Sequence, residues 1–294
     1  MNIIPQGIIT PMITPFDQKE QVDYHTLKKM VNYLINEGVH GLFPLGSTGE
    51  SYALSFEQKK AIIETVLEAT NQRVPVYAGT GAITTKESIQ ITQMAAKLGV
   101  DAVSVITPYF ISPNEEELYH HFQAISASTD LPMILYNNPD RTGIDLSINL
   151  ILRLSQIDNI TGIKDSSGDM TKAIEIIRCV KDDFAVLAGL DTLIYGFLSI
   201  GGKGAVAATA NIVPRLVVAI YESYQKGDYQ ASLEAQFKLA PLRIAFRLGS
   251  FPVIIKEGLK LRGIDVGNTL RPIEPISPEA REELKQIIEK IDIS

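Results

Sequence analysis

The stretch Ile160–Asp169, ITGIKDSSGD, places a lysine at the end of an apolar run, directly before residues that can begin a helix. Lysine is among the residues least often fully buried. Lys164, at the last inward position of a strand, therefore either pairs with an acid or takes part in chemistry. Asp169 is of the type that caps a helix N-terminus. The stretch predicts a strand, a strand-end lysine and a following helix.

The same unit of strand and helix recurs along the chain. Seven further apolar or β-branched runs alternate with segments of i, i+3, i+4 apolar spacing; the runs are Gly7–Thr14, Gly41–Leu45, Val74–Thr80, Ala102–Thr107, Leu131–Asn137, Phe184–Gly189 and Gly204–Ala208. Such near-continuous apolar strands are typical of parallel sheets, which are covered on both faces. Eight strands, each followed by a helix, predict an α/β fold, a (β/α)8 TIM barrel. An open doubly wound sheet is the alternative, disfavoured because no GxGxxG follows the first strand.

Local signals mark the helix starts and a change of pattern near the C-terminus. Ser55–Gln58 reads as a capping box, and Asn114, Asp169 and Asp191 stand where N-caps are expected. After about Tyr229 the pattern is helical throughout. We expect residues 1–226 to form the barrel and residues 227–294 a C-terminal helical extension.

Composition restricts the class of protein. The chain has 294 residues, 45% of them hydrophobic, with a net charge of −7 and a pI near 5.2. An acidic chain is a poor match for nucleic acid or an anionic membrane, and no apolar run reaches the ~20 residues of a membrane-spanning helix. The one cysteine, Cys179, allows no internal disulfide. We expect a cytoplasmic protein with neither nucleic-acid nor membrane partners.

Other reactive side chains show no pattern that predicts a site. The four histidines, His25, His40, His120 and His121, lack metal-ligand spacing with acids at strand ends, so no metal site is expected. Of the adjacent pair, one is expected to face solvent. Cys179 lies in a helical apolar stripe and is interpreted as a core residue.

The active site of such a barrel lies at the C-terminal ends of its strands. Gly46–Ser51, GSTGES, follows the second strand and offers two hydroxyls, Ser47 and Thr48, with glycines that let backbone N–H groups converge on a small anion. Tyr136 ends the fifth strand and Lys164 the sixth. An anion nest, an amine and a phenol at one mouth are what Schiff-base chemistry on a 2-oxo acid requires.

Two alternatives remain open at this point. Lys164 could form an ion pair with Glu50 or Asp191 across the barrel mouth and have a structural role. The glycines Gly201, Gly202 and Gly204 resemble a phosphate-binding turn at the eighth strand. They leave open a sugar-phosphate isomerase or lyase, although tight backbone packing is the preferred interpretation.

At these residues the sequence resembles the family of dihydrodipicolinate synthase and N-acetylneuraminate lyase. The similarity runs from GIITPMITPF through GSTGE, AGTGA, TPYF, LYNNPDRTG, GIKDSSGD and GGKGAVAATAN to TLRPIEPI. The resemblance implies a (β/α)8 barrel with a C-terminal helical extension, a homotetramer or homodimer, and a carbon–carbon lyase that forms a covalent lysine imine with pyruvate. It implies no metal and no organic cofactor; the partners are pyruvate and an aldehyde.

The resemblance also assigns roles to individual residues. Lys164 matches the Schiff-base lysine, Tyr136 the proton-relay tyrosine, and Ser47 with Thr48 the pair that binds the pyruvate carboxylate, Thr48 being counted as catalytic as well. Further positions match substrate-binding residues of the family: Gly189, Val206, Arg141, Tyr109 and Phe110.

The resemblance does not identify the second substrate, because individual residues point to different members of the family. Arg141 matches the arginine that holds aspartate semialdehyde in the synthases. Phe110 replaces the tyrosine that completes the synthase proton relay across the subunit interface, and Ser47 stands where synthases usually carry threonine. Thr192 replaces the glutamate that sialate lyases use, and Lys164–Ser166 resembles the loop of 2-keto-3-deoxy-sugar-acid aldolases.

The sequence therefore favours a class I aldolase that forms or cleaves a C–C bond between pyruvate and an aldehyde, with a 2-keto-3-deoxy-sugar-acid substrate. The alternative is 4-hydroxy-tetrahydrodipicolinate synthase, which condenses pyruvate with aspartate semialdehyde. A 2-oxo-acid dehydratase or deaminase, a sialate lyase and a non-catalytic sugar-acid-binding barrel are less favoured.

Overall fold

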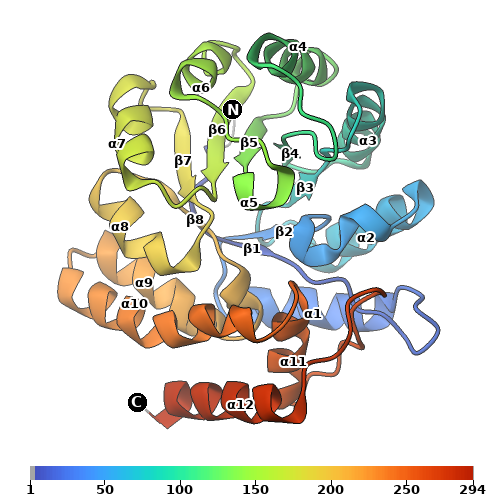
Figure 1. Ribbon diagram of the computed structural model, residues 1–294, viewed down its shortest axis with the longest axis vertical. Helices are drawn as coiled ribbons and strands as arrows, with labels where there is room; N and C mark the ends of the chain where they lie inside the picture. Colours follow the sequence, from blue (N-terminus) through green and yellow to red (C-terminus); the bar gives the residue numbers. More distant parts are fainter. Residues whose placement is uncertain (1–3, 294) are drawn as a thin grey trace.

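Eight parallel strands form the centre of the computed structural model, which describes residues 4–293 (Figure 1). The strands are β1 (Gly7–Pro11), β2 (Gly41–Phe43), β3 (Tyr77–Gly79), β4 (Ala102–Ile106), β5 (Met133–Asn137), β6 (Ile160–Asp165), β7 (Ala185–Ala188) and β8 (Gly204–Val206). Their order is β2-β1-β8-β7-β6-β5-β4-β3, and a parallel bridge between Leu42 and Val76 joins the two ends. The fold is therefore the predicted (β/α)8 barrel.

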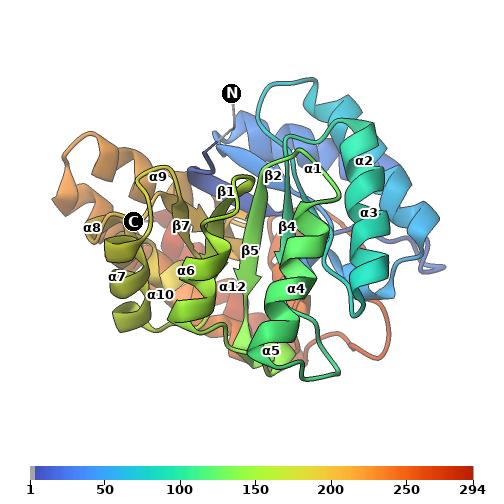
Figure 2. The same ribbon diagram turned by 90° about the horizontal axis from the view of Figure 1, so that it is seen from above.

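The helices surround the strands, as Figures 1 and 2 show, except for the short α5, which lies at the end of β5 inside this ring. They are α1 (Tyr24–Asn36), α2 (Phe56–Thr70), α3 (Thr85–Leu98), α4 (Glu115–Ser126), α5 (Pro139–Thr142), α6 (Ile148–Leu154), α7 (Met170–Cys179), α8 (Ile194–Ser199) and α9 (Pro214–Gln225). Most of the buried apolar side chains lie between strands and helices. A smaller cluster fills the barrel interior: Ile9, Phe43, Tyr77, Ala102, Ile134, Leu187 and Val206. This interior cluster fills the barrel below the C-terminal strand ends, where the active site of such a barrel lies.

Three further helices follow α9: α10 (Tyr229–Ile244), α11 (Val253–Leu261) and α12 (Pro278–Ile293). Figure 1 shows them along one edge of the barrel, where α10 packs on α9 and α12 packs on both α10 and α11. Within residues 4–293, no helix is long and apolar enough to cross a membrane.

The local signals were read correctly with two exceptions. The capping box at Ser55 and the N-caps at Asn114 and Asp169 are confirmed. Asp191 is not an N-cap, because its carboxylate accepts hydrogen bonds from Thr209 instead. Cys179 is exposed rather than in the core, because α7 ends at this residue.

Candidate active site

The ends of β5 and β6 place Tyr136 and Lys164 side by side. The two residues are register partners in neighbouring parallel strands, so their side chains point to the same face, into the barrel mouth. Lys164 Nζ lies 3.7 Å from the centre of the Tyr136 ring and 5.5 Å from that of Phe43, a residue of the interior cluster. Both Lys164 and Tyr136 are 5% exposed. The amine is thus held against a phenol in a largely dry environment.

The surroundings of Tyr136 favour loss of its proton. Burial alone raises the pKa of the phenol, but the charge of Lys164 and hydrogen bonds with Asn138, Lys164 and Ser47 lower it by more. The net result is a Tyr136 pKa below its ordinary value. Asn138 Nδ2 donates to the phenolic oxygen at 2.8 Å. A phenol with a lowered pKa, beside an amine, is suited to proton transfer.

A polar network on the opposite face of the same strands fixes this pair. Asn137 and Asp165, each one residue past the inward side chain, are also register partners. Asn137 Nδ2 donates to Asp165 at 2.9 Å and to Asp145 at 2.8 Å. Lys172, from α7, donates from Nζ to the same Asp145 carboxylate. This network ties β5 to β6 directly behind Tyr136 and Lys164.

The GSTGES loop faces the lysine and is held in an unusual backbone conformation. The loop follows Leu45, at φ 61°, and its short 3₁₀ helix, Ser47–Gly49, ends at Glu50, at φ 54°. Both are non-glycine residues in the left-handed region, a conformation that persists only where surrounding contacts enforce it. One such contact is visible at Gly49, whose carbonyl accepts a hydrogen bond from Thr14 Oγ1 at 2.7 Å.

The carboxylate of Glu50 supplies a second constraint on this loop. Glu50 Oε1 lies 2.8 Å from Lys256 Nζ of α11, and neither side chain has any exposed surface. Glu50 Oε2 also accepts from the Leu270 N–H at 2.8 Å, and Lys256 donates to the Asn268 carbonyl. Burial lowers the pKa of Lys256 to about 8, although the charge of Glu50 opposes this. The pair locks the substrate-facing loop to the C-terminal helices.

These contacts exclude the structural alternative for Lys164. Glu50 is engaged by Lys256, and the Asp191 carboxylate accepts from Thr209 N–H at 2.6 Å and Oγ1 at 2.5 Å. In the described part of the chain, Lys164 forms no ion pair with either acid. The glycines near β8 show the tight packing that was expected. A Cβ on Gly202, in the turn before β8, would lie 2.7 Å from the Phe197 carbonyl oxygen, and one on Gly204, the first residue of β8, would lie 2.1 Å from the Gly7 carbonyl oxygen.

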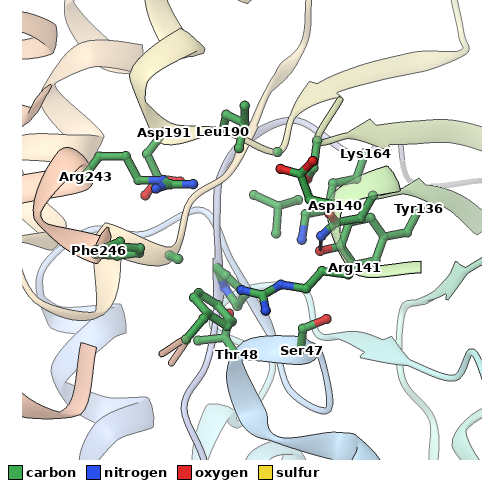
Figure 3. A pocket seen from close by; sticks show the side chains of 17 residues that line it. Ser47, Thr48, Tyr136, Asp140, Arg141, Lys164, Leu190, Asp191, Arg243 and Phe246 are labelled. Atoms are coloured by element: carbon green, nitrogen blue, oxygen red, sulfur yellow. Dashed lines mark hydrogen bonds between the residues drawn. The ribbon is translucent and has the colours of Figure 1, made fainter. Parts of the chain in front are cut away.

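A cavity of about 330 Å³ contains most of the residues that the sequence singled out (Figure 3). Its predicted members are Ser47, Thr48, Tyr136, Arg141, Lys164, Gly189 and Val206. Gly189 permits close approach of two strand ends, because a Cβ there would lie 2.0 Å from Ser166 Oγ. Hydroxyls that follow β2, a phenol and a guanidinium from the end of β5, and an amine from β6 thus converge on one space from three strand ends.

Tyr109 and Phe110 lie apart from this cavity. Tyr109 lines an adjoining cavity of about 280 Å³, which shares Ser47 and Arg141 with the first. Phe110 lines neither cavity; its side chain is 94% exposed and its φ is 72°. Within a single copy of the chain, Phe110 therefore does not contact the site.

Several cavity residues were not predicted from the sequence. Asn138 and Asp140 belong to the quoted strand-five motif, but no role was given to either. Arg243, Phe246 and Phe251 also line the cavity and come from the C-terminal part of the chain. Nothing in the helical pattern of that segment distinguishes an inward arginine from a surface one.

The remaining polar candidates behave as packing or surface residues. His121 is buried, which lowers its pKa to about 4, and its Nδ1 lies 2.9 Å from Thr85 Oγ1. The neighbouring His120 is exposed, as expected for one of the pair. Among residues 4–293, no group of three or more His, Cys, Asp or Glu side chains could hold a metal ion.

The fold and the site together define a class: (β/α)8-barrel proteins with a buried lysine at the end of β6, set against a tyrosine and facing a hydroxyl-rich loop. Comparison with known proteins agrees with this class. The model of the dihydrodipicolinate synthetase family matches residues 4–291. The chain therefore belongs to this family, whose members are lyases and synthases that form C–C bonds from pyruvate through a lysine Schiff base.

Individual relatives cover almost the whole chain. A 4-hydroxy-tetrahydrodipicolinate synthase of Methanospirillum hungatei is 38% identical over 98% of this chain and 99% of its own length. Dihydrodipicolinate synthase DapA-2 of Bacillus anthracis is 36% identical, with a TM-score of 0.95 over 98% of this chain and 99% of its own. YagE of E. coli K12, a family member solved in complex with pyruvate, is 33% identical, with a TM-score of 0.94 over 98% and 99% of the two chains.

Proposed function

We propose that this protein condenses pyruvate with aspartate semialdehyde, as a 4-hydroxy-tetrahydrodipicolinate synthase, through an imine on Lys164. The observation that carries the proposal is the buried Lys164 amine 3.7 Å from the Tyr136 ring, in a cavity that also holds Ser47, Thr48 and Arg141. The curated relatives named for this synthase reaction are 35–38% identical to the chain, which favours the synthase over the sugar-acid aldolase that the sequence first indicated.

Each residue of the site has a defined role in this proposal. Ser47 and Thr48 bind the pyruvate carboxylate, because their hydroxyls and the adjacent backbone N–H groups suit a small anion. Lys164 Nζ adds to C2 of pyruvate, and loss of water gives the imine. Tyr136 moves protons to and from the departing oxygen, consistent with its lowered pKa.

The carbon–carbon bond follows from the electronics of the imine. Loss of a proton from C3 gives an enamine, and C3 then bonds to the aldehyde carbon while the aldehyde oxygen takes up a proton. Arg141 binds the carboxylate of the aldehyde, since its planar guanidinium matches a carboxylate in geometry and charge. The amino group of the semialdehyde, or water, then adds to the imine carbon; the C–N bond to the enzyme breaks as its nitrogen takes up a proton, and Lys164 is released as the free amine.

One observation favours a second candidate, the 2-keto-3-deoxy-sugar-acid aldolase. Phe110 stands where the resemblance places a relay tyrosine, and a phenyl ring carries no exchangeable proton. The loss of that phenol counts against the synthase, because the resemblance gives the phenol a role in the synthase proton relay. The two candidates share the lysine imine and differ in the aldehyde.

The test compares aldehydes at saturating pyruvate. We expect kcat/KM for aspartate semialdehyde to exceed that for glyceraldehyde, and Lys164→Ala to abolish both activities while the circular dichroism spectrum is retained. A preference for glyceraldehyde would establish the sugar-acid candidate instead. Substantial activity in Lys164→Ala would contradict both.

A further inference from the structure

A second arginine reaches the Lys164 cavity from outside the barrel. Arg141 belongs to α5, directly after β5, whereas Arg243 belongs to α10. Both line the cavity, together with Phe246 and Phe251 from the segment that follows α10. The C-terminal part of the chain therefore builds one wall of the site.

The orientation of α10 is fixed by a buried glutamine. Gln236 Nε2 donates to the Asp191 carbonyl at 3.0 Å, and its Oε1 accepts from the Tyr195 N–H at 2.9 Å. Residues seven apart lie on the same face of a helix. Arg243, seven residues after Gln236, therefore lies on the face that is held against the barrel rim.

The two guanidinium groups are oriented but not neutralised. Arg141 Cζ lies 4.7 Å from the centre of the Phe251 ring, and Arg243 Cζ lies 4.9 Å from that of Phe246. Stacking on an aromatic face sets the plane of a guanidinium and leaves its N–H donors free. Within residues 4–293, neither guanidinium group makes a hydrogen bond or an ion pair.

The acids of the cavity do not supply the missing partner. Thr209 donates both of its hydrogen bonds to Oδ2 of Asp191, and among the described residues this carboxylate forms no ion pair with Arg243. Asp140 also lines the cavity, but among the described residues it forms no ion pair with Arg141 or Arg243. Figure 3 shows the two guanidinium groups pointing into the cavity from opposite sides. Two guanidinium groups, each a multiple N–H donor, thus line one cavity of about 330 Å³.

We propose that Arg243 is a specificity residue for the second substrate: together with Arg141 it binds the carboxylate of an acidic aldehyde. The inference rests on the proposed function, in which Ser47 and Thr48 take the pyruvate carboxylate and leave the arginines for the other reactant. The C-terminal helix α10, and not the barrel alone, thus selects for an acidic aldehyde over a neutral one.

The test uses the full-length variant Arg243→Gln, which removes the charge and keeps much of the side-chain volume. Arg247→Gln is the matched control, because Arg247 lies one turn further on, is 71% exposed and approaches Glu283 at 3.8 Å. Steady-state rates are measured at saturating pyruvate with two acidic aldehydes, aspartate semialdehyde and succinate semialdehyde, and with neutral glyceraldehyde.

We expect Arg243→Gln to lower kcat/KM for the acidic aldehydes about 10- to 100-fold, mainly through KM, since a hydrogen-bonded charge is lost. Glyceraldehyde, the pyruvate imine trapped by borohydride, and all activities of Arg247→Gln should be unchanged. An equal loss for acidic and neutral aldehydes, or no loss, would overturn the inference while leaving the proposed function in place. A parent enzyme that traps pyruvate but uses neutral aldehydes alone would overturn both, and no trapped pyruvate at all would overturn the imine chemistry itself.

Discussion

Lys256→Met tests whether the buried Glu50–Lys256 ion pair holds the substrate-facing loop to the C-terminal helices. The substitution leaves the Glu50 carboxylate fully buried without its partner, which stands 2.8 Å away in the parent. Removing one member of a buried ion pair costs about 3–5 kcal/mol. A domain has in total about 5–15 kcal/mol of stability, so this loss is a large fraction of it.

The double variant Glu50→Gln/Lys256→Met distinguishes the cost of an unpaired buried charge from the cost of losing the ion pair itself. With both charges gone, no uncompensated charge remains, so we expect it to be more stable than Lys256→Met by about 1–3 kcal/mol. Chemical unfolding at fixed protein concentration, followed by circular dichroism, measures all variants. Lys260→Met is the control, because Lys260 lies one turn along α11 and is partly exposed in its pair with Glu257.

Activity should follow stability at this position. Because Glu50 ends the loop that carries Ser47 and Thr48, we also expect a raised KM for pyruvate in Lys256→Met. A loss below about 1 kcal/mol in Lys256→Met, or a double variant no more stable than Lys256→Met, would show that the two charges are not coupled. The Glu50–Lys256 pair would then not be what holds the loop in place.

Three further changes test other parts of the account. The His121 pKa is lowered to about 4 in the folded state, against 6.5 as its ordinary value, so the protein loses stability as pH falls from 6.5 toward 4. His121→Asn should reduce the difference in the free energy of unfolding between pH 7 and pH 4.5 by up to about 3 kcal/mol, as measured by denaturation at both pH values. The same difference in the parent and in the variant would show that His121 is not its source. Gly189→Ala places a Cβ 2.0 Å from Ser166 Oγ; we expect a loss of about 1–3 kcal/mol and lower kcat, whereas wild-type behaviour would mean that the strand ends can move apart. Phe110→Tyr supplies a phenol at the position from which the resemblance has a tyrosine reach the neighbouring subunit's site. If such an interface forms, kcat/KM for aspartate semialdehyde should rise without a change in imine trapping; no gain would show that position 110 has no part in the proton relay here.

The barrel could be predicted because its signals are local and repeated. Each strand is a short apolar run, and caps such as Ser55, Asn114 and Asp169 mark helix starts by residue type. The proximity of Lys164 and Tyr136 could also be predicted, because parallel strands bring their C-terminal ends to one edge.

What could not be predicted depends on contacts between distant segments. The Glu50–Lys256 pair joins residues 206 positions apart, and neither residue type predicts full burial. Arg243 lies in a helix whose pattern does not reveal which face meets the barrel. Cys179 was placed in the core wrongly for a local reason. An apolar stripe predicts which face of a helix is buried, but it does not predict the residue at which the helix ends.

The central claim is that Lys164 forms an imine with pyruvate, and trapping that imine tests it most directly. The protein is incubated with pyruvate, reduced with borohydride, digested and analysed by mass spectrometry. The account predicts a reduced pyruvate adduct on the peptide that contains Lys164, and none in Lys164→Ala. A folded parent protein without an adduct, or with the adduct on another lysine, would contradict it.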